Sequence, residues 1–582
     1  MQFFEVKTKL EAEELIRICP EVIAIDTEYV PGDPRTTRLL SIICADEDRA
    51  WIISPSLLPM LTPMLRARKL IFMQDYNRCD TIILNSNGCD LRNTYCLNLI
   101  DMHHLIDETK DHSLEARVWE TFQDDYKTRL KGQYQDLEYQ GKDGIYTYKL
   151  GMQDLKQLEV LHKLELLEHV RRTSNALIDT SINGILVDVQ LMERTKQEMS
   201  GKINEYLPKL REEFKDACTS WELKEWQRQI DKRSTDRGKS GVKRPQFSFA
   251  SDKQIAWLLY EYLELPVTER TKKRNPSTSY EALKSLSERH GGLQTLVEYK
   301  ETKSIYSTFV EGMLDRVQDD RIYPNFNVSG TDTGRISHSN PNMANLPTDG
   351  VIRQFFIPTP GYSIIGADYT QLEVVVEANL TRDPNLLRII KEGVSKHDIT
   401  AQGLEIDRNT AKTLNFALQY GAGKGKIAKI LNVSKQQAED IYERYWKLYS
   451  GVRVLKEQTN KILEETGEVT NLFGRTRHFS KPKNEYELAK QQRQAYNFLI
   501  QGVAGDACNR AYWRFRADLK KSELGRGLFT VHDEIIAEVK NGHCESWKEH
   551  LEFIMEAVSE HLNFEFPLTA KAYGPLKAWS KT

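Results

Sequence analysis

The sequence has no strong excess of charge of either sign. Its 582 residues include 81 Lys and Arg and 84 Asp and Glu, which gives a formal net charge of −3. An overall basic character, the simplest sign of a nucleic-acid-binding protein, is therefore absent, so any such binding would have to come from local patches. Hydrophobic residues make up 40% and charged residues 28%, which excludes a mostly disordered chain. The length suggests about four domains.

Paired cysteines and long apolar runs are also absent. None of the eight cysteines has C-x-x-C spacing, which is unlike a zinc site and favours buried, reduced thiols. The N-terminus has no charged segment followed by an apolar run, so we expect no signal peptide. No segment approaches ~20 consecutive apolar residues, so we expect no membrane span and an intracellular, cytoplasmic protein.

Hydrophobic periodicity divides the chain into regions of different secondary structure. The first ~165 residues are predicted to be α/β. Four apolar runs there are predicted strands: 22–25, 39–45, 51–53 and 69–72. Residues ~186–310 are predicted to be mainly helical, because Leu and Ile recur at three- and four-residue spacing. From ~321 the pattern favours strands, then helices, then strands again near 526–540.

Two basic segments interrupt the helical region. Segment 228–244 contains seven basic and two acidic residues, and Arg270, Lys272, Lys273 and Arg274 form the second segment. Both are either solvated loops or phosphate-contacting loops that become ordered on binding, and the sequence leaves the two alternatives open.

The first predicted strand ends in acidic residues. Asp26 and Glu28 are two residues apart, so on a strand both side chains point to the same face. Neighbouring carboxylates repel each other unless cations lie between them, and this arrangement suits divalent metal ions. Tyr139 and Asp143 have the spacing that places two residues on one face of a helix, and Asp80 is a further acid.

Two further strands are predicted to end in acids. Asp368 follows the apolar run 362–367, and Asp533 lies at a predicted tight turn between strands. The two aspartates are candidates to face each other across neighbouring strands. They could then bridge two metal ions ~3.5–4 Å apart, as in-line phosphoryl displacement requires.

A helical pattern between these two acids carries Arg408, Lys412, Phe416 and Tyr420 at intervals of four residues. On a helix the four side chains form one nearly continuous stripe. Two cations and two rings on one stripe suit a triphosphate attached to a flat base. The cations can neutralise phosphate charge, and the rings can pack against sugar and base.

These segments resemble the motifs of a known enzyme family. Residues 368–373 (D-Y-T-Q-L-E), the R-x-x-x-K-x-x-x-F-x-x-x-Y-G helix and 531–534 (V-H-D-E) are similar to motifs A, B and C of family A DNA polymerases. The resemblance covers essentially the whole chain from Asp26. It implies template-directed DNA synthesis from dNTPs, by two-metal nucleotidyl transfer to a primer 3′-hydroxyl, in DNA replication. The implied cofactor is Mg²⁺, two ions per active site, with Mn²⁺ as a substitute.

The resemblance implies roles for individual residues. The implied catalytic residues are Asp368, Asp533 and Lys412, with Asp368, Asp533 and Tyr369 as metal ligands. The implied nucleotide-binding residues are Arg408, Lys412, Phe416, Tyr420, His397, Glu373 and Gln371. The implied DNA-binding residues are Arg335, Asn345, Arg353, Arg493, Asn497, Gln501 and His532. Glu373 would be the steric gate that selects dNTPs over NTPs. Val375 replaces an arginine that is usual in the family, so a supporting ion pair is missing or replaced.

The first group of acids resembles the three motifs of DEDD 3′–5′ exonucleases of the Tyr-bearing kind. The implied catalytic set is Asp26, Glu28, Asp80, Tyr139 and Asp143, whose four carboxylates would hold two Mg²⁺ ions while the tyrosine orients a water molecule. Asp154 is an alternative to Asp143, although Leu150 then occupies the tyrosine position. This resemblance implies proofreading.

Together the resemblances imply an α+β and α/β multidomain fold, in which an RNase H-like exonuclease domain precedes a right-hand polymerase. The implied domains are the exonuclease (1–165), the thumb with its palm-connecting segment (166–320), the palm (321–395 and 502–582) and the fingers (396–501). Ten residues separate His397 from Arg408, as in phage replicative members, so we expect a phage protein in the host cytoplasm. The expected partners are primer–template DNA, dNTPs and phage or host replication proteins, and we expect a monomer that does not bind membranes.

Three other functions fit the sequence less well. A single-subunit RNA polymerase would normally carry Tyr in place of Glu373 and would lack the acids at 26 and 28. A non-catalytic nucleic-acid-binding relative would not need Asp368 and Asp533. A stand-alone DEDD nuclease with an unrelated C-terminal half would leave the striped helix unexplained.

Overall fold

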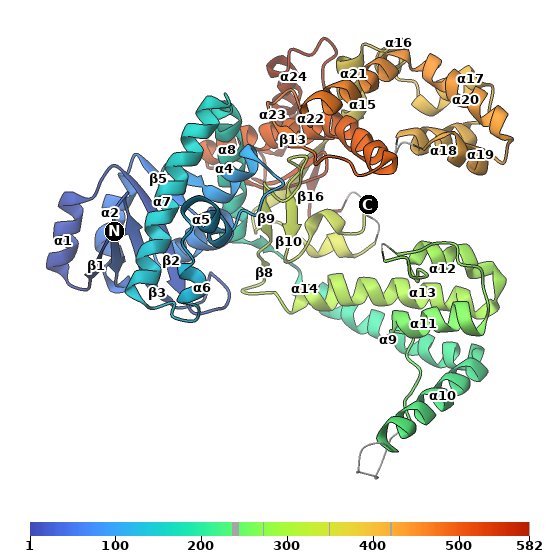
Figure 1. Cartoon of the computed structure of the whole chain (residues 1–582), viewed down its shortest axis with the longest axis horizontal. Coiled ribbons are helices and arrows are strands. Elements are labelled where there is room, and N and C mark those ends of the chain that lie inside the picture. The colour runs from blue at the N-terminus through green and yellow to red at the C-terminus, as the bar shows by residue number, and fades with distance from the viewer. Residues whose placement is uncertain (235–243, 272, 349, 420–421, 581–582) are drawn as a thin grey trace. The chain divides into compact units, whose positions relative to one another are not determined.

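The computed structural model describes residues 1–234, 244–271, 273–348, 350–419 and 422–580 (Figure 1). Contacts between residues divide the chain into two compact units. The larger unit consists of Met1–Ile185, Tyr323–Asn345 and Ile357–Thr582, and the smaller one of Leu186–Ile322 and Leu346–Phe356. Within the described ranges no helix is both long enough and apolar enough to cross a membrane. All eight cysteines are free thiols, and most are buried.

A six-stranded mixed sheet forms the N-terminal part of the larger unit, with the strand order β1-β4-β3-β2-β5-β6. Its strands are β1 (Gln2–Val6), β2 (Val22–Tyr29), β3 (Leu39–Ala45), β4 (Arg49–Ile53), β5 (Leu70–Met73) and β6 (Cys96–Asn98). The four predicted strands are confirmed. Strand β2 continues beyond the apolar run and includes Asp26 and Glu28, as predicted.

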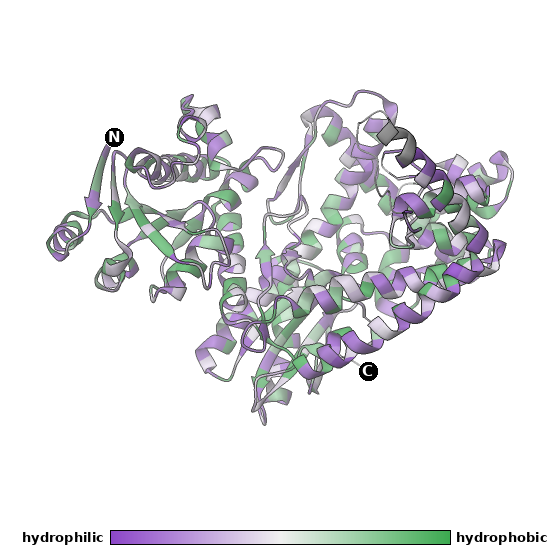
Figure 2. Ribbon diagram, turned by 90° about the horizontal axis from the view of Figure 1, so that it is seen from below, coloured by the Kyte–Doolittle hydropathy of each residue, from purple (hydrophilic) through white to green (hydrophobic). Residues whose placement is uncertain are grey.

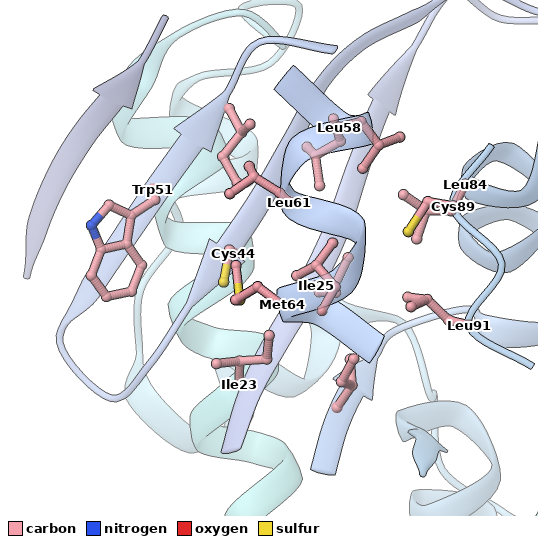
Figure 3. Packing of buried hydrophobic residues seen from close by; sticks show 14 of the residues in the cluster. Ile23, Ile25, Cys44, Trp51, Leu58, Leu61, Met64, Leu84, Cys89 and Leu91 are labelled. Carbon is pink, nitrogen blue, oxygen red and sulfur yellow. The ribbon is translucent and has the colours of Figure 1, made fainter. Parts of the chain in front are cut away.

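Helices cover both faces of this sheet. On one face Leu58, Leu61 and Met64 of α2 (Leu58–Arg66) join Ile23 and Ile25 of β2 in a buried apolar cluster (Figure 3). The opposite face carries α7 (Leu137–Val160), where Gly144 lies against Ile43. A Cβ at Gly144 would lie 2.6 Å from the Ile43 side chain, so glycine permits the close approach of α7 to the sheet. Since side chains alternate along β2, Asp26 and Glu28 point to the face that α7 covers.

The other helices of this region connect the strands or follow the sheet. They are α1 (Lys9–Ile18), η1 (Pro55–Leu57), η2 (Tyr76–Asp80), α3 (Thr81–Ser86), α4 (Leu99–Ile106), α5 (Leu114–Phe122), α6 (Tyr126–Arg129) and α8 (Leu164–Asn183). Helix α8 belongs to the larger unit.

A four-stranded antiparallel sheet with the order β14-β15-β11-β16 lies in the C-terminal part of the larger unit. Its strands are β11 (Tyr362–Tyr369), β14 (Gly525–Val531), β15 (Glu534–Lys540) and β16 (Ala570–Leu576). The predicted strand–turn–strand around Asp533 is confirmed. Helices α15 (Leu372–Thr381), α22 (Glu485–Ser522), α23 (Cys544–Glu556) and α24 (Val558–His561) belong to the same region, and α22 and α23 pack against this sheet.

A mainly helical segment lies between α15 and α22 in the sequence. Its elements are α16 (Pro384–Glu392), α17 (Lys396–Leu404), α18 (Arg408–Gln419), α19 (Lys424–Leu431), α20 (Lys435–Leu448), α21 (Ser450–Thr466), β12 (Glu468–Thr470) and β13 (Thr476–His478). Before β11 the chain forms the hairpin β9 (Asn325–Asn327) and β10 (Ser337–Ser339) and the short helix η6 (Met343–Asn345). Hydrophilic and hydrophobic residues are interspersed along the helices (Figure 2).

The smaller unit is helical, as predicted for ~186–310. Its helices are α9 (Val189–Glu213), α10 (Lys215–Ser234), α11 (Asp252–Trp257), η3 (Leu258–Tyr262), α12 (Tyr280–Leu286), η4 (Ser287–Arg289), α13 (Gly291–Ile305), η5 (Tyr306–Glu311), α14 (Gly312–Leu314) and η7 (Ile352–Phe355). In sequence the unit is bordered by β7 (Ile185–Leu186) and β8 (Arg321–Ile322). Its core contains Leu210, Phe214, Phe249, Leu293 and Leu296.

The first basic segment, 228–244, is not a loop throughout. Helix α10 extends to Ser234, so the prediction of a loop is wrong for its first part. No Gly or Pro occurs between Lys215 and Ser234, and the Lys, Arg, Gln and Glu of this stretch are good helix formers. Residues 235–243 of this segment and Lys272 of the second lie outside the described residues.

Candidate active sites

Two aspartates lie side by side at the end of the four-stranded sheet. Asp368 is near the end of β11, opposite Glu534 of β15, and Asp533 lies at the turn that precedes β15. The backbone N–H of Tyr369 donates a hydrogen bond of 3.2 Å to the Asp533 carbonyl, which joins the two segments. His532 adopts the left-handed backbone conformation, with φ of 54°, at the turn. Asp368 and Asp533 are called the β11 cluster below.

The environment of Asp533 fits a cation. Burial raises the pKa of its carboxyl, the Arg335 guanidinium lowers it, and the carboxylates of Glu373 and Asp368 raise it. The Oδ1 atom of Asp533 is buried and has no hydrogen-bond partner among the described residues. A buried carboxylate oxygen of this kind needs a donor or a cation, and carboxylates are the ligands that Mg²⁺ prefers. Asp368 is exposed at the same strand end, so a second carboxylate could share the ion.

Arg335 pairs with Glu373 in this cluster. Its guanidinium donates a hydrogen bond of 2.6 Å to Glu373 Oε1 and lies 3.9 Å from Asp533 Oδ1. Val375, which replaces the usual arginine of the motif, is buried and makes no ion pair of its own. Arg335 was expected only to bind DNA, but its position shows that it supplies a supporting ion pair at this site.

The side chain of Tyr369 cannot be a metal ligand here. Its hydroxyl donates a hydrogen bond of 2.8 Å to the Met555 carbonyl, and the ring is buried. Because side chains alternate along a strand, the ring points away from the face that Asp368 presents. A metal-binding role for Tyr369 could therefore come only from its main-chain carbonyl oxygen.

Many of the predicted nucleotide-binding and DNA-binding residues line one cavity of about 250 Å³. Those in its lining are Gln371 and Glu373 of the α15 region, His397 of α17, Phe416 of α18, and Asn497 and Gln501 of α22. Four segments far apart in the sequence thus meet around one space. Its size is below the range of typical small-molecule sites, and it is lined by carboxylate, amide and imidazole groups.

The predicted stripe on α18 is exposed to ligands. Lys412 and Phe416 are exposed, and Arg408 forms an ion pair of 2.8 Å with Asp398 at the helix surface. An exposed phenylalanine beside cations is unusual for a solvated helix face and suits a ligand with a ring and charge. Tyr420, the last member of the predicted stripe, lies outside the described residues.

His397 faces this stripe, and its ring lies 5.8 Å from the Phe416 ring. The Asn415 side chain and His397 Nδ1 are 3.0 Å apart, so the amide can donate to this nitrogen and leave Nε2 as the donor. Burial lowers the pKa of His397, and the charges of Arg408 and Lys412 lower it further. The neutral imidazole can therefore still donate one hydrogen bond toward an anion.

Glu377, Lys396 and Tyr496, which also line the cavity and contact one another, were not predicted from the sequence. The Tyr496 hydroxyl donates a hydrogen bond of 2.6 Å to Glu377 Oε1, and Lys396 forms an ion pair of 3.3 Å with Glu377 Oε2. Lys396 adjoins His397 and Tyr496 adjoins Asn497, so Glu377 links the helices that carry two predicted ligand-binding residues. Glu377 could have been predicted from its spacing, because it lies four residues after Glu373 on the same face of α15.

The remaining predicted DNA-binding residues are distributed over the chain. Arg493 lies on α22, four residues before Asn497, and lines a second cavity of about 330 Å³. Asn345, in η6, and His532 are exposed. Arg353 belongs to the smaller compact unit, where η7 holds it buried.

The second group of acids lies between β2 and α7. Oxygens of Asp26, Glu28 and Asp143 lie within 4.8 Å of one another, close enough to share a metal ion. Asp154, the alternative to Asp143, instead forms a buried ion pair of 2.6 Å with Arg117. Of the two alternatives, the geometry therefore places Asp143 with the other acids. Asp26, Glu28, Asp80 and Asp143 are called the β2 cluster below.

The acids of the β2 cluster resist ionisation. Burial raises the pKa of Asp26 well above its ordinary value, and the charges of Asp80 and Asp143 add to this effect. Burial, followed by the charges of Asp26 and Asp143, raises the pKa of Glu28 to about 8. Asp80 accepts a hydrogen bond of 2.7 Å from Thr27, but burial still raises its pKa to about 7. Such a set of carboxylates fits divalent cations, which would compensate its charge.

Two residues from α6 also contact this cluster and were not predicted. Lys127 forms an ion pair of 2.7 Å with Asp143, and the Tyr126 hydroxyl donates a hydrogen bond to the same carboxylate. Lys127 also donates a hydrogen bond of 3.3 Å to the hydroxyl of Tyr139, the predicted water-orienting residue. No spacing pattern connects α6 with α7, so the sequence held no signal for these contacts.

The chain is similar to known polymerases. Residues 215–580, more than half of the chain, match the family model of DNA polymerase family A. DNA polymerase I of Bacillus subtilis is 28% identical over 460 residues, which cover 75% of this chain and 48% of the relative. The thermostable DNA polymerase I of Thermus aquaticus is 32% identical over 335 residues, which cover 54% and 40%. The chain thus spans less than half the length of these relatives.

A solved structure has the same fold. It is the POL domain of Pol1 from M. smegmatis in complex with DNA primer-template and dNTP, and the TM-score is 0.82. The sequences are 21% identical, and the match covers 100% of this chain and 99% of that chain. The predicted fold class, a multidomain chain of mixed α/β structure with the architecture of a right-hand polymerase, is confirmed.

Proposed function

Since the chain belongs to DNA polymerase family A, we propose that it extends a primer 3′-hydroxyl with dNTPs under the direction of a DNA template. The observation that carries this proposal is the position of the β11 cluster beside the cavity lined by Glu373, His397 and Phe416. That arrangement combines acids for metal ions with side chains that could contact the base, sugar and phosphates of a nucleotide.

The β11 cluster would hold two Mg²⁺ ions, with the main-chain carbonyl of Tyr369 as a further ligand. When bound, the metal ions would lower the pKa of the primer hydroxyl and stabilise the departing pyrophosphate. Arg408 and Lys412 would bind the triphosphate, and Nε2 of His397 would donate a hydrogen bond to it. Binding of phosphate by Arg408 would require it to leave its exposed ion pair with Asp398, which costs little.

Sugar selection would depend on Glu373. Its ion pair with Arg335 holds the carboxylate in place beside the cavity, where it would fill the space that a 2′-hydroxyl needs. Gln371 and Phe416 would complete the nucleotide site, and Phe416 predicts discrimination against dideoxynucleotides. Arg335, Asn345, Arg353, Arg493, Asn497, Gln501 and His532 would contact the primer–template.

We propose that the chain has the domains of a polymerase with an exonuclease. The exonuclease would occupy 1–165, the thumb with its connecting segment 166–320, the palm 321–395 and 502–582, and the fingers 396–501. Ten residues between His397 and Arg408 support a replicative phage enzyme, which would act as a monomer in the host cytoplasm with phage or host replication proteins.

We further propose that the β2 cluster removes nucleotides from DNA 3′ ends. Asp26, Glu28, Asp80 and Asp143 would hold two Mg²⁺ ions, and Tyr139 would orient the attacking water. The proximity of three carboxylates from β2 and α7 supports this proposal. In the test, Asp26→Ala should abolish Mg²⁺-dependent degradation of a single-stranded 3′ end and leave primer extension intact. Absence of such degradation in the wild type would refute the proposal.

Primer extension with one nucleotide at a time tests the polymerase function. With Mg²⁺ and a matched primer, the wild type should add only the dNTP that is complementary to the template base and should disfavour the matching NTP. Asp368→Asn should add almost none. Preference for NTPs would favour an RNA polymerase, and unchanged extension by Asp368→Asn would refute the assignment of the β11 cluster.

A further inference from the structure

The ammonium group of Lys127 lies among the carboxylates of the β2 cluster, where a metal ion would bind. It comes from α6, the short helix before α7, and its Nζ atom lies 2.7 Å from Oδ1 and 2.8 Å from Oδ2 of Asp143. Both oxygens of that carboxylate are thus engaged by one ammonium group. The Tyr126 hydroxyl also donates to Oδ1. A metal ion can use Asp143 only if these contacts are released or shared.

The charge of Lys127 acts on the whole cluster. It opposes the rise in pKa that burial causes at Asp26, Glu28 and Asp143, so its ammonium group stabilises all three carboxylates. Lys127 is itself largely buried, with 18% of its side chain exposed, and it also donates to the Tyr139 hydroxyl. A buried lysine remains charged when anions surround it, and here both oxygens of the Asp143 carboxylate contact the ammonium group.

We propose that Lys127 is a built-in counter-ion of the β2 cluster, which holds the metal-free carboxylates together and must be displaced from Asp143 when divalent ions bind. Lys127 is a positioning residue in this role. The inference rests on the proposed exonuclease function only in one respect: that function identifies the divalent ion that displaces Lys127 as Mg²⁺. Its basis is the contact of one ammonium group with both oxygens of the ligand carboxylate.

Two consequences follow from charge and geometry. Removal of the ammonium group should strengthen binding of divalent ions, because a competing cation and its repulsion are lost. It should also destabilise the metal-free protein, because three neighbouring acids lose their nearby positive charge. A lysine that only packs against α7 would lower stability without strengthening metal binding, so the two measurements separate the roles.

Lys142 provides a matched control. It lies on α7, forms ion pairs of 2.7 Å with Asp124 and 3.1 Å with Glu138, and lies 5.6 Å from the Tyr126 ring, as Lys127 does. Its side chain is 15% exposed, close to the 18% of Lys127. The two lysines therefore share burial, charge and an aromatic neighbour, but Lys142 makes no hydrogen bond or ion pair to Asp143 among the described contacts.

The experiment measures Mn²⁺ binding to the full chain without DNA, by electron paramagnetic resonance. The site is defined as the binding that Asp26→Asn removes. Lys127→Met should bind Mn²⁺ at this site about 10-fold more tightly than the wild type, and its metal-free form should melt at a lower temperature. Lys142→Met should keep the wild-type affinity. Lys127→Arg, which retains the charge, should also stay close to the wild type.

The outcomes distinguish this inference from the proposed function. Equal or weaker Mn²⁺ binding by Lys127→Met would overturn the inference, while 3′-end degradation by the wild type would still support the exonuclease. Tighter binding by Lys127→Met without wild-type degradation would support the inference and refute the exonuclease. Absence of Asp26-dependent binding in both proteins would overturn both. If Lys127→Met does not fold, Lys127→Gln takes its place: tighter Mn²⁺ binding than the wild type would support the inference, and equal or weaker binding would overturn it.

Discussion

The two carboxylate clusters of this chain differ in how the repulsion between their acids is compensated. The β2 cluster brings Asp26, Glu28 and Asp143 together between the middle of a sheet and a covering helix, with Asp80 from η2, and a lysine provides its nearest cation. The β11 cluster has two acids at the end of a sheet, with an arginine nearby. One cluster is therefore crowded and buried, and the other is small and open to its ligands.

The difference in burial has a chemical consequence. In the β2 cluster the pKa values of Glu28 and Asp80 are raised to about 8 and about 7, so protons compete with metal ions near neutral pH. At the β11 cluster Asp368 is exposed, and Arg335 opposes the rise in the pKa of Asp533. We therefore expect metal binding to depend more strongly on pH at the β2 cluster than at the β11 cluster.

The largest effect is expected for Asp533→Asn, which tests whether the clusters act independently. Loss of one of only two carboxylates should reduce single-turnover dNTP incorporation by at least about 10³-fold, because the metal ions lose a shared ligand. Degradation of a single-stranded 3′ end should stay within about 2-fold of the wild type. A parallel loss of both activities would show that the clusters are coupled.

Asp143→Asn and Asp154→Asn separate the two alternatives for the last acid of the β2 cluster. Asp143→Asn should reduce 3′-end degradation by at least about 10²-fold, since Asp143 lies with Asp26 and Glu28. Asp154→Asn should leave the activity of the folded protein within about 3-fold but lower its melting temperature, because Arg117 loses its buried partner. The opposite pattern would assign the metal site to Asp154.

Glu377→Gln should produce a smaller effect, confined to nucleotide binding. The variant loses the ion pair with Lys396, so the helices that carry His397 and Asn497 are held less firmly. The KM for dNTP should rise about 3- to 10-fold, equivalent to about 1 kcal/mol, with a smaller change in kcat. Glu392→Gln, which removes an exposed ion pair with Arg388, is the control. Equal effects of the two variants would exclude a positioning role for Glu377.

The smallest effect is expected for Glu28→Gln, in the pH dependence of the melting temperature. Glu28 keeps its proton up to about pH 8 in the folded protein, whereas the unfolded chain loses it near the ordinary pKa of 4.5. Folding stability therefore falls as the pH rises between these two values. Without metal, Glu28→Gln should melt close to the wild type below pH 4.5 and about 2–4 °C higher by pH 8. Mg²⁺ should reduce this difference, and a difference independent of pH would contradict the raised pKa.

Local spacing predicted much of the fold and of both clusters. Asp26 and Glu28 on one strand face, Tyr139 and Asp143 on one helix, and the stripe from Arg408 on α18 all follow from the periods of two and of about four residues. Contacts between distant segments could not be predicted in this way. Among these are the pairs of Arg335 with Glu373, of Glu377 with Tyr496 and of Lys127 with Asp143.

The net charge of −3 likewise did not predict nucleic-acid binding, because acidic and basic residues are concentrated in different places. Acids gather in the two clusters, whereas cations line α18, so the sum conceals a charge pattern suited to metal ions and phosphates. The choice between Asp143 and Asp154 also needed the structure. Both lie on α7, and only the packing of that helix on β2 separates the residue beside Asp26 from the residue beside Arg117.

A primer with a mismatched 3′ end tests most directly whether one chain carries two separate metal-dependent sites. With Mg²⁺ and all four dNTPs, the wild type should remove the mismatched nucleotide and then extend the primer. Asp26→Asn should stall at the mismatch but extend a matched primer, and Asp368→Asn should only shorten the primer. If Asp26→Asn corrected the mismatch as well as the wild type does, or if Asp368→Asn still extended the primer, the account would be contradicted.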